Sequence, residues 1–129
     1  MTVLLDTSVI IDVLRERRGR HDLLRQLAQQ GHRFCYCAIN VTEVYAGMRS
    51  GEAEVTADLF DRLEYVEVTF EIARTAGSLI LDWRRKGRTL ELPDATIAAV
   101  ALQLGLTLAT DNRKDFPMRE LQFLPLAEA

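Results

Sequence analysis

The sequence predicts an α/β protein in which a central, mainly parallel sheet lies between two layers of helices. Two observations predict this class. Short apolar runs alternate with longer amphipathic stretches along the chain, as strands alternate with helices. Parallel neighbouring strands need a crossover connection, and an intervening helix supplies it. Because such crossovers are right-handed, helices cover both faces, and we expect a three-layer α/β/α sandwich.

Length and composition agree with a globular protein. The chain has 129 residues, 48% hydrophobic and 27% charged, with no repeat or linker, so we expect one domain over residues 1–129. No apolar run approaches the roughly 20 residues that span a bilayer, and Asp6 comes too early for a signal peptide. We therefore expect a cytoplasmic protein without membrane association. The net charge of −3 argues against a nucleic-acid coat protein but not against an enzyme acting on RNA or DNA.

The first half of the chain is expected to hold two strands and four helices. Glycines at positions 19 and 31 follow the first two amphipathic stretches, and Asn40 and Glu43 have capping-box spacing at the start of the third. Strands are predicted at residues 3–5 and 33–38, and helices at residues 8–17, 21–30, 40–49 and 52–63. Cys35 and Cys37 would share one face of the second strand, and we interpret them as buried core side chains.

The second half continues the alternation. A strand is predicted at residues 65–68, followed by a long helix at residues 70–86. Pro93 opens the next helix, and Gly105 ends it. A fourth strand is expected at residues 106–109, and residues 121–124 are the candidate for an edge strand.

Acidic residues recur where an expected element begins or ends. Asp6 follows the first strand, Glu43 lies in the first turn of a helix, and Asp94 follows Pro93. Asp111 and Asp115 follow the last long strand. Sites in open parallel sheets form beyond the carboxyl ends of the strands, so we expect these acids to converge in an anionic pocket. A cation or retained protons must stabilise such a pocket, and oxygen ligands suit Mg²⁺ or Mn²⁺.

Each acid also has a purely structural interpretation. Asp6 is either a helix cap or a metal ligand. Glu43 completes a capping box with Asn40 whether or not it has another role. Asp94 lies on the apolar stripe of its helix, where the helix dipole offsets only about 0.3–1 kcal/mol of the several kcal/mol that burying a charge costs. Asp94 therefore requires a cationic partner, either a metal ion or an arginine.

The segments that carry these acids together resemble the PIN-domain family, most closely the VapC-type toxins of bacterial toxin–antitoxin pairs. The resemblance covers nearly the whole chain and rests on four segments in a fixed order. They are Leu4-Leu5-Asp6-Thr7-Ser8-Val9-Ile10, Asn40-Val41-Thr42-Glu43-Val44, Pro93-Asp94-Ala95-Thr96-Ile97-Ala98-Ala99 and Thr110-Asp111-Asn112-Arg113-Lys114-Asp115-Phe116. It implies a three-layer α/β/α fold and a Mg²⁺- or Mn²⁺-dependent endoribonuclease.

The resemblance also implies roles and partners. Metal binding falls on Asp6 and Asp94, and an essential acid on Glu43. Where the family often has a fourth acid, this chain has Asn112, which brings no charge. Asp115 is our preferred substitute, and Asp111 is the other candidate. The implied partners are an RNA substrate such as tRNA, an antitoxin whose C-terminal segment blocks the pocket, and a second copy of the chain.

Three functions compete at this point. The first is a metal-dependent toxin ribonuclease in which Asp6 and Asp94 hold the ion and Glu43 orients or deprotonates water. The second is a degenerate member that binds RNA or a protein without cleavage, which Asn112 keeps open. The third, a phosphatase of another α/β family, is disfavoured because no Asp-x-Asp motif follows the first strand.

Two further groups of residues suggest binding surfaces. Basic residues cluster at positions 15, 17, 18 and 20 and again at positions 84, 85, 86 and 88. Each cluster is either a solvated face or a grip for the RNA backbone. Tyr45, Met48 and Phe60 are expected either to pack in the core or to form a surface for a partner.

Overall fold

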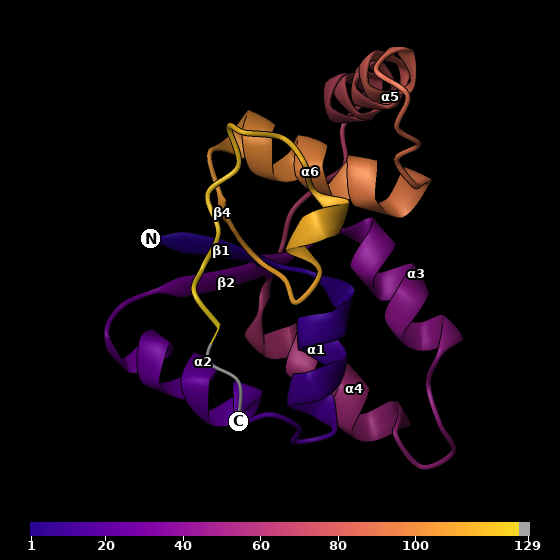
Figure 1. The fold of residues 1–129 in the computed structure, drawn as a ribbon. Coiled ribbons are helices and arrows are strands. Elements are labelled where there is room, and N and C mark those ends of the chain that lie inside the picture. Colours follow the sequence, from indigo (N-terminus) through magenta and orange to yellow (C-terminus); the bar gives the residue numbers. More distant parts are fainter. Residues whose placement is uncertain (127–129) are drawn as a thin grey trace.

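A computed structural model describes residues 1–126 and has the predicted three-layer architecture (Figure 1). The four strands are β1 (Thr2–Leu5), β2 (Arg33–Tyr36), β3 (Glu64–Tyr65) and β4 (Thr107–Ala109). They pair in the order β3-β2-β1-β4, and every pair is parallel. The expected α/β fold with a parallel central sheet is confirmed.

Strand β1 lies at the centre of the sheet and is buried on both faces. Leu4 pairs in register with Cys35 of β2 and Leu108 of β4. Val3, Leu4 and Leu5 are all within 1% of complete burial. This explains why β1 is a continuous apolar run rather than an alternating one.

Two helices cover one face of the sheet, α5 (Phe70–Arg85) and α6 (Leu92–Leu104). Their apolar side chains pack on Leu4, Cys35 and Leu108, which point to this face. Helix α6 has buried residues at every position from 95 to 101, because α5 packs on its side away from the sheet (Figure 1). Gly105 ends α6 in the left-handed conformation with φ 65°, as the sequence predicted.

The opposite face is covered by α1 (Thr7–Leu14), α2 (Arg20–Gln29) and α4 (Ala53–Arg62). Val3 and Leu5, which alternate with Leu4, point into this second core. Phe60 of α4 is 8% exposed and belongs to the same core, so of the two roles expected for it the structure shows core packing. Its ring lies 4.6 Å from that of Tyr36 on β2.

Helix α3 (Ala38–Ala46) follows β2 at the carboxyl edge of the sheet and contacts both α1 and α6. It begins two residues earlier than expected. Cys37 precedes its first residue, and Oδ1 of Asn40 accepts from the backbone N–H of Cys37 at 2.8 Å. The predicted capping box of Asn40 with Glu43 is therefore wrong, and Glu43 lies in the second turn, where its carboxylate is not needed as a cap.

Other boundaries also differ from the prediction. Strand β2 ends at Tyr36 instead of residue 38, so Cys37 lies outside the strand and precedes α3, and the two cysteines do not share a strand face. Strand β3 covers only Glu64–Tyr65 instead of residues 65–68. Within the described residues, the segment 121–124 is not a strand. It is joined to β4 by a single parallel bridge between Phe123 and Leu108. Helix α1 ends at Leu14, and the following loop has positive φ at Glu16 and Arg18.

Cys35 and Cys37 are both fully buried and unbonded to each other. Burial raises the pKa of the Cys35 thiol to about 12 and also raises the pKa of Cys37. Both thiols therefore stay protonated and act as small apolar side chains, as expected. None of the helices within residues 1–126 is long and apolar enough to cross a membrane.

Candidate active site

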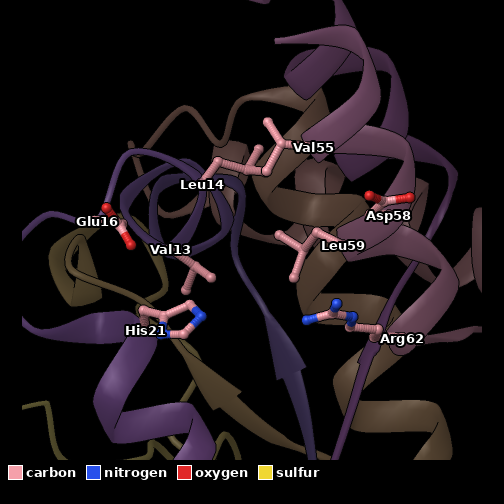
Figure 2. Close-up of a pocket in the computed structure, with 8 residues that line it drawn as sticks. All are labelled: Val13, Leu14, Glu16, His21, Val55, Asp58, Leu59 and Arg62. Carbon is pink, nitrogen blue, oxygen red and sulfur yellow. The ribbon is translucent and has the colours of Figure 1, made fainter.

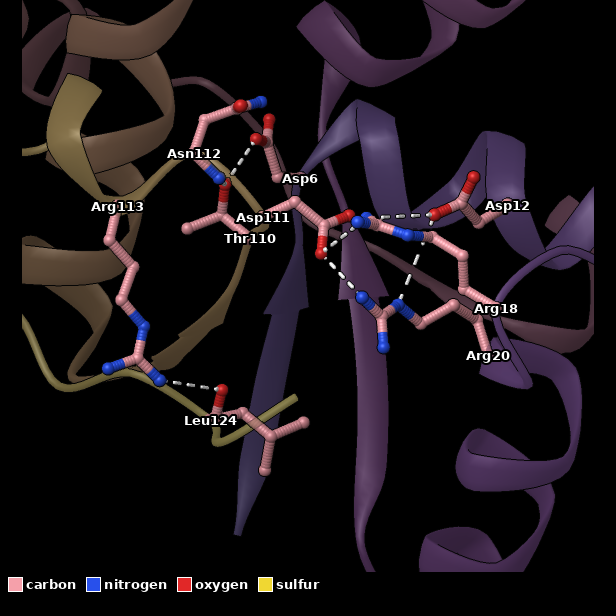
Figure 3. Close-up of polar contacts among 9 residues, drawn as sticks. All are labelled: Asp6, Asp12, Arg18, Arg20, Thr110, Asp111, Asn112, Arg113 and Leu124. Atoms are coloured by element: carbon pink, nitrogen blue, oxygen red, sulfur yellow. Dashed lines mark hydrogen bonds and ion pairs between the residues drawn. The ribbon is translucent and has the colours of Figure 1, made fainter. Parts of the chain in front are cut away.

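Asp6 lies directly after β1, at the carboxyl edge of the sheet, and is 6% exposed. It caps α1, because its Oδ1 accepts from the backbone N–H of Thr7 at 2.9 Å. Its Oδ2 accepts from the hydroxyl of Thr110 at 2.7 Å, at the end of the neighbouring strand β4 (Figure 3). Burial is the main reason that the pKa of Asp6 is raised, although both hydrogen bonds act to lower it.

Asp94 lies in the first turn of α6, whose N-terminus faces the same edge because the helix runs antiparallel to the strands. Its carboxylate is partly buried. Burial and then the charges of neighbouring acids raise the pKa of Asp94 to about 6. In decreasing order of effect, those neighbours are Asp6, Asp115, Glu43 and Glu91. Three acids from β1, α3 and the loop after β4 thus converge on the N-terminus of α6.

Glu43 reaches this group from α3. Its Oε1 accepts from the hydroxyl of Thr7 at 2.7 Å. Thr7 in turn receives a hydrogen bond at 3.1 Å from the amide of Asn40, which is fully buried. Glu43 and Asp6 are therefore held by the same residue, Thr7, through its side chain and its backbone.

The loop after β4 separates the three candidates for a further acid. Asp111 pairs with Arg20 at 2.5 Å and with Arg18 at 3.1 Å. Asn112 donates its backbone N–H at 2.9 Å to the same Thr110 hydroxyl that binds Asp6 (Figure 3). Asp115 ends the short 3-10 helix η1 (Arg113–Asp115) and lies close enough to contribute to the pKa of Asp94.

The charge on Asp111 is balanced by a buried cluster of ion pairs. Arg20 is 1% exposed and lies between Asp111 and Asp12, with Arg18 beside it (Figure 3). The first basic cluster is thus mainly structural rather than a solvated face, because Arg15 also pairs, at 3.3 Å, with Glu52. These ion pairs join the α1–α2 loop to the loop that carries Thr110.

The acids at the edge have no such compensation. Within residues 1–126, Asp6, Glu43, Asp94 and Asp115 form no ion pair with Lys, Arg or His. Of the two partners that the sequence allowed for Asp94, an arginine is therefore not found among the described residues. An uncompensated group of carboxylates favours a cation.

The donor set fits some metal ions better than others. Among the described residues, no three His, Cys, Asp or Glu side chains are grouped tightly enough to hold one ion directly. Structural zinc sites need about four such ligands, so they are disfavoured here. Mg²⁺ keeps several waters and is often held by only one or two carboxylates, so two acids with oxygen ligands suit it.

The second basic cluster is exposed and lies near the acidic group. Arg84, Arg85, Lys86 and Arg88 lie at the end of α5 and in the loop before α6. Arg88 donates to the backbone carbonyl of Lys114 in η1, one residue before Asp115. This cluster therefore remains available for an anionic partner.

A separate hollow of about 340 Å³ lies between the end of α1, the start of α2 and α4 (Figure 2). Val13, Leu14, Val55 and Leu59 form its apolar lining. Charged or polar side chains at its rim are Glu16, His21, Asp58 and Arg62. Its lining contains none of the converging acids, so the hollow lies apart from the candidate site.

Sequence reasoning did not predict how three residues hold the acids in place. They are Thr7, Thr110 and Asn40, of which only Asn40 had an expected role, as a cap with Glu43. All three occur within the segments that carry the family resemblance, next to or near an acid in the sequence. That proximity was the available signal, but the partner of each hydroxyl depends on contacts that only the fold reveals.

The fold and site define an α/β protein with acidic residues gathered beyond the carboxyl ends of a parallel sheet. A sequence profile of the PIN domain matches residues 3–122. Ribonuclease VapC19 of Mycobacterium tuberculosis is 31% identical over 115 residues, 89% of this chain and 92% of that protein. Ribonuclease VapC10 of the same organism is 32% identical over 125 residues, 97% of this chain and 93% of that one. The chain belongs to the PIN-domain family, among its VapC-type members.

Solved structures agree on the fold. The structure of VapBC2 from Rickettsia felis, bound to a DNA fragment from its promoter, matches with a TM-score of 0.81 and 22% identity, covering 96% of this chain and 98% of that one. VapBC-1 from nontypeable Haemophilus influenzae matches with a TM-score of 0.80 and 22% identity, covering 98% of each chain. At this level of identity the likeness supports the architecture alone.

Proposed function

We propose that this chain is a metal-dependent endoribonuclease and the toxin of a type II toxin–antitoxin pair. The observation that carries the proposal is the uncompensated set of acids around Asp94, whose pKa is raised to about 6 by burial and by neighbouring carboxylates. Proteins tolerate such repulsion where function requires it. The similarity to the VapC ribonucleases supports RNA as the substrate.

Asp6 and Asp94 are our proposed metal ligands. Bound Mg²⁺ or Mn²⁺ would activate a water and neutralise charge on the phosphate. Asp6 is preorganised for this role because hydrogen bonds from Thr7 and Thr110 fix both of its oxygens while each retains a lone pair. Asp94 contributes a carboxylate whose charge is compensated by no described basic side chain.

Glu43 is our proposed acid for orienting water or accepting its proton. Its Oε1 is held by Thr7, and Oε2 receives no hydrogen bond from the described residues, which leaves that oxygen for water or a second ion. We propose Asp115 as the fourth acid, since it contributes to the pKa of Asp94. Asp111 is a poor candidate because Arg18 and Arg20 already neutralise it.

RNA would reach the acids across the second basic cluster. Arg84, Arg85, Lys86 and Arg88 are exposed, and Arg88 contacts η1 one residue before Asp115. Phosphate contacts of this kind release counterions, so cleavage should weaken steeply with added salt. We place the activity in the cytoplasm, where tRNA is one available substrate.

We also propose an antitoxin and a second copy of the chain as partners. VapBC toxin–antitoxin complexes are among the similar structures, which supports the antitoxin. An antitoxin arginine would compensate the acids near Asp94 in place of a metal ion. Tyr45 and Met48 are 42% and 37% exposed and supply apolar surface for a partner. Light scattering on the purified chain, alone and with the product of a neighbouring reading frame, tests both associations.

The activity test uses purified protein and labelled tRNA with Mg²⁺, Mn²⁺ or EDTA. We expect cleavage with either metal, none in EDTA, and none for Asp6→Asn or Asp94→Asn. Asp82→Asn is the matched control, because Asp82 is an exposed acid on α5 and its loss should leave cleavage unchanged. Cleavage in EDTA, or full activity of a folded Asp6→Asn variant, would overturn the proposal.

A second candidate is a PIN domain that binds RNA or protein without cleavage. The specific observation in its favour is Asn112, which is linked to Asp6 through the Thr110 hydroxyl and carries no charge. This candidate predicts that tRNA is retained in a gel-shift assay but is intact with Mg²⁺ and with Mn²⁺. Replacing Asn112 with Asp would then test whether one added charge restores cleavage.

A further inference from the structure

A directed chain of hydrogen bonds ends on the carboxylate of Glu43. The backbone N–H of Cys37 donates to Oδ1 of Asn40 at 2.8 Å. Nδ2 of Asn40 donates to the hydroxyl oxygen of Thr7 at 3.1 Å. The Thr7 hydroxyl donates to Oε1 of Glu43 at 2.7 Å. Asn40 is completely buried and Thr7 is 8% exposed, so bulk water cannot easily replace these contacts.

The chemistry of each group fixes the direction of the chain. A backbone N–H only donates, so Cys37 requires an acceptor and thereby fixes which end of the Asn40 amide faces it. The NH₂ end of Asn40 must then face Thr7. Because a hydroxyl has one proton and its oxygen accepts from Asn40, that proton is directed to Glu43. A donor at this position holds the Glu43 carboxylate in a single orientation.

Thr7 also joins Glu43 to Asp6. Its backbone N–H donates to Oδ1 of Asp6 at 2.9 Å, and its side chain contacts Glu43. Thr7 begins α1, whereas Glu43 belongs to α3, so these contacts connect two elements at the sheet edge. The placement of one acid relative to the other therefore depends on Thr7.

We propose that Thr7 and Asn40 are positioning residues that act on catalysis through Glu43. This inference rests on the proposed function, in which Glu43 orients or deprotonates the attacking water. Neither residue needs to touch RNA or metal. They hold the Glu43 carboxylate as a hydrogen-bond acceptor on Oε1 and so aim Oε2 at the water.

The test compares Thr7→Val with Thr7→Ser in metal-dependent RNA cleavage. Valine keeps the shape of threonine but removes the hydroxyl, whereas serine keeps the hydroxyl. Misplacing a catalytic group by about 1 Å lowers rates by about 100-fold. We expect Thr7→Val to lower kcat by roughly 10- to 100-fold with KM for RNA little changed, and Thr7→Ser to restore kcat to within about threefold of the parent.

A double variant separates positioning from general damage. If Thr7 acts through Glu43, adding Thr7→Val to Glu43→Gln should lower the residual rate no further, because the two effects are not additive. Thr42→Val is the matched control. Thr42 is an exposed residue of α3 whose hydroxyl donates to the carbonyl of Ala38 at 3.2 Å, and its replacement should leave kcat unchanged.

A second variant keeps the inference testable if Thr7→Val fails to fold. Asn40→Asp retains the acceptor for Cys37 but presents an acceptor to Thr7 in place of a donor. The Thr7 proton is then contested between residues 40 and 43, and kcat should fall with KM unchanged. Wild-type kcat in folded Thr7→Val and Asn40→Asp would overturn the inference while leaving the nuclease intact. Absence of metal-dependent cleavage by the parent chain would instead overturn the proposed function.

Discussion

Replacing Asp94 with Asn should stabilise the metal-free protein while removing its activity. The folded state raises the pKa of Asp94 from 3.8 to about 6, so folding favours the protonated carboxyl over the charged one. Stability linked to this group is present below about pH 4 and is lost as the pH rises through 6. Asparagine resembles the protonated form and carries no charge at any pH.

The structure sets the size of the effect. The difference between 3.8 and about 6, at about 1.4 kcal/mol for each pH unit, corresponds to about 3 kcal/mol for a fully buried group. Because Asp94 is only partly buried, solvent screens the repulsion, and we expect about 1 kcal/mol in practice. For a protein of this size, that corresponds to an increase in Tm of about 3–6 °C.

The assay is thermal or urea unfolding in EDTA at pH 7 and again at pH 4. Asp94→Asn should exceed the parent in stability at pH 7, and the difference should nearly vanish at pH 4. Asp82→Asn changes the net charge equally but removes an exposed acid, so it should match the parent at both values. Equal or lower stability of Asp94→Asn at pH 7, or a gain that persists at pH 4, would refute the reasoning.

Three further changes have defined outcomes. Mg²⁺ binding measured by calorimetry should strengthen as the pH rises through about 6, because the ion competes with the proton on Asp94; a constant affinity between pH 5 and 8 would contradict this. Arg20→Met should lower the free energy of unfolding by about 3 kcal/mol in urea, since it leaves Asp111 and Asp12 with one fewer buried cation, and adding Asp111→Asn should recover part of the loss. Gly105→Ala should lower the free energy of unfolding by about 1 kcal/mol, because φ at this position is 65° and alanine is strained there. The space around Gly105 is open, so no steric clash adds to this cost, and an unchanged urea midpoint would contradict the prediction.

Local patterns in the sequence predicted most of the architecture. The apolar run at residues 3–5 and the amphipathic spacing of the long helices fixed the strand–helix alternation, and Pro93 and Gly105 fixed both ends of α6. The prediction also put Asp6 and Asp94 at the same edge of the sheet. Parallel strands and the helices between them run in opposite directions, so the end of a strand and the start of a helix lie at the same edge.

The errors concern choices that depend on tertiary contacts. Asn40 and Glu43 have capping-box spacing, but Asn40 instead bonds Cys37 one turn earlier, and the fold directs Glu43 to Thr7. The spacing of Phe60 on its helix allows either a core or a surface position. Its ring contact with Tyr36 of β2, which depends on how α4 packs on the sheet, places it in the core. The sequence pattern put Arg20 in a basic cluster. In the fold, Arg20 is buried, and its ion pair with Asp111, which is distant in the sequence, offsets the cost of removing its charge from water.

Parallel pairing of β1 with β4 has a consequence for how the chain is made. Asp6 is translated 104 positions before Thr110, whose hydroxyl fixes the Asp6 carboxylate. Asp94 and the last strand beside β1 are also translated late. A nascent chain therefore cannot assemble the acidic pocket until β4 and Thr110 have been synthesised. If the proposed acids carry the activity, that activity must therefore wait until both ends of this long-range contact have been synthesised.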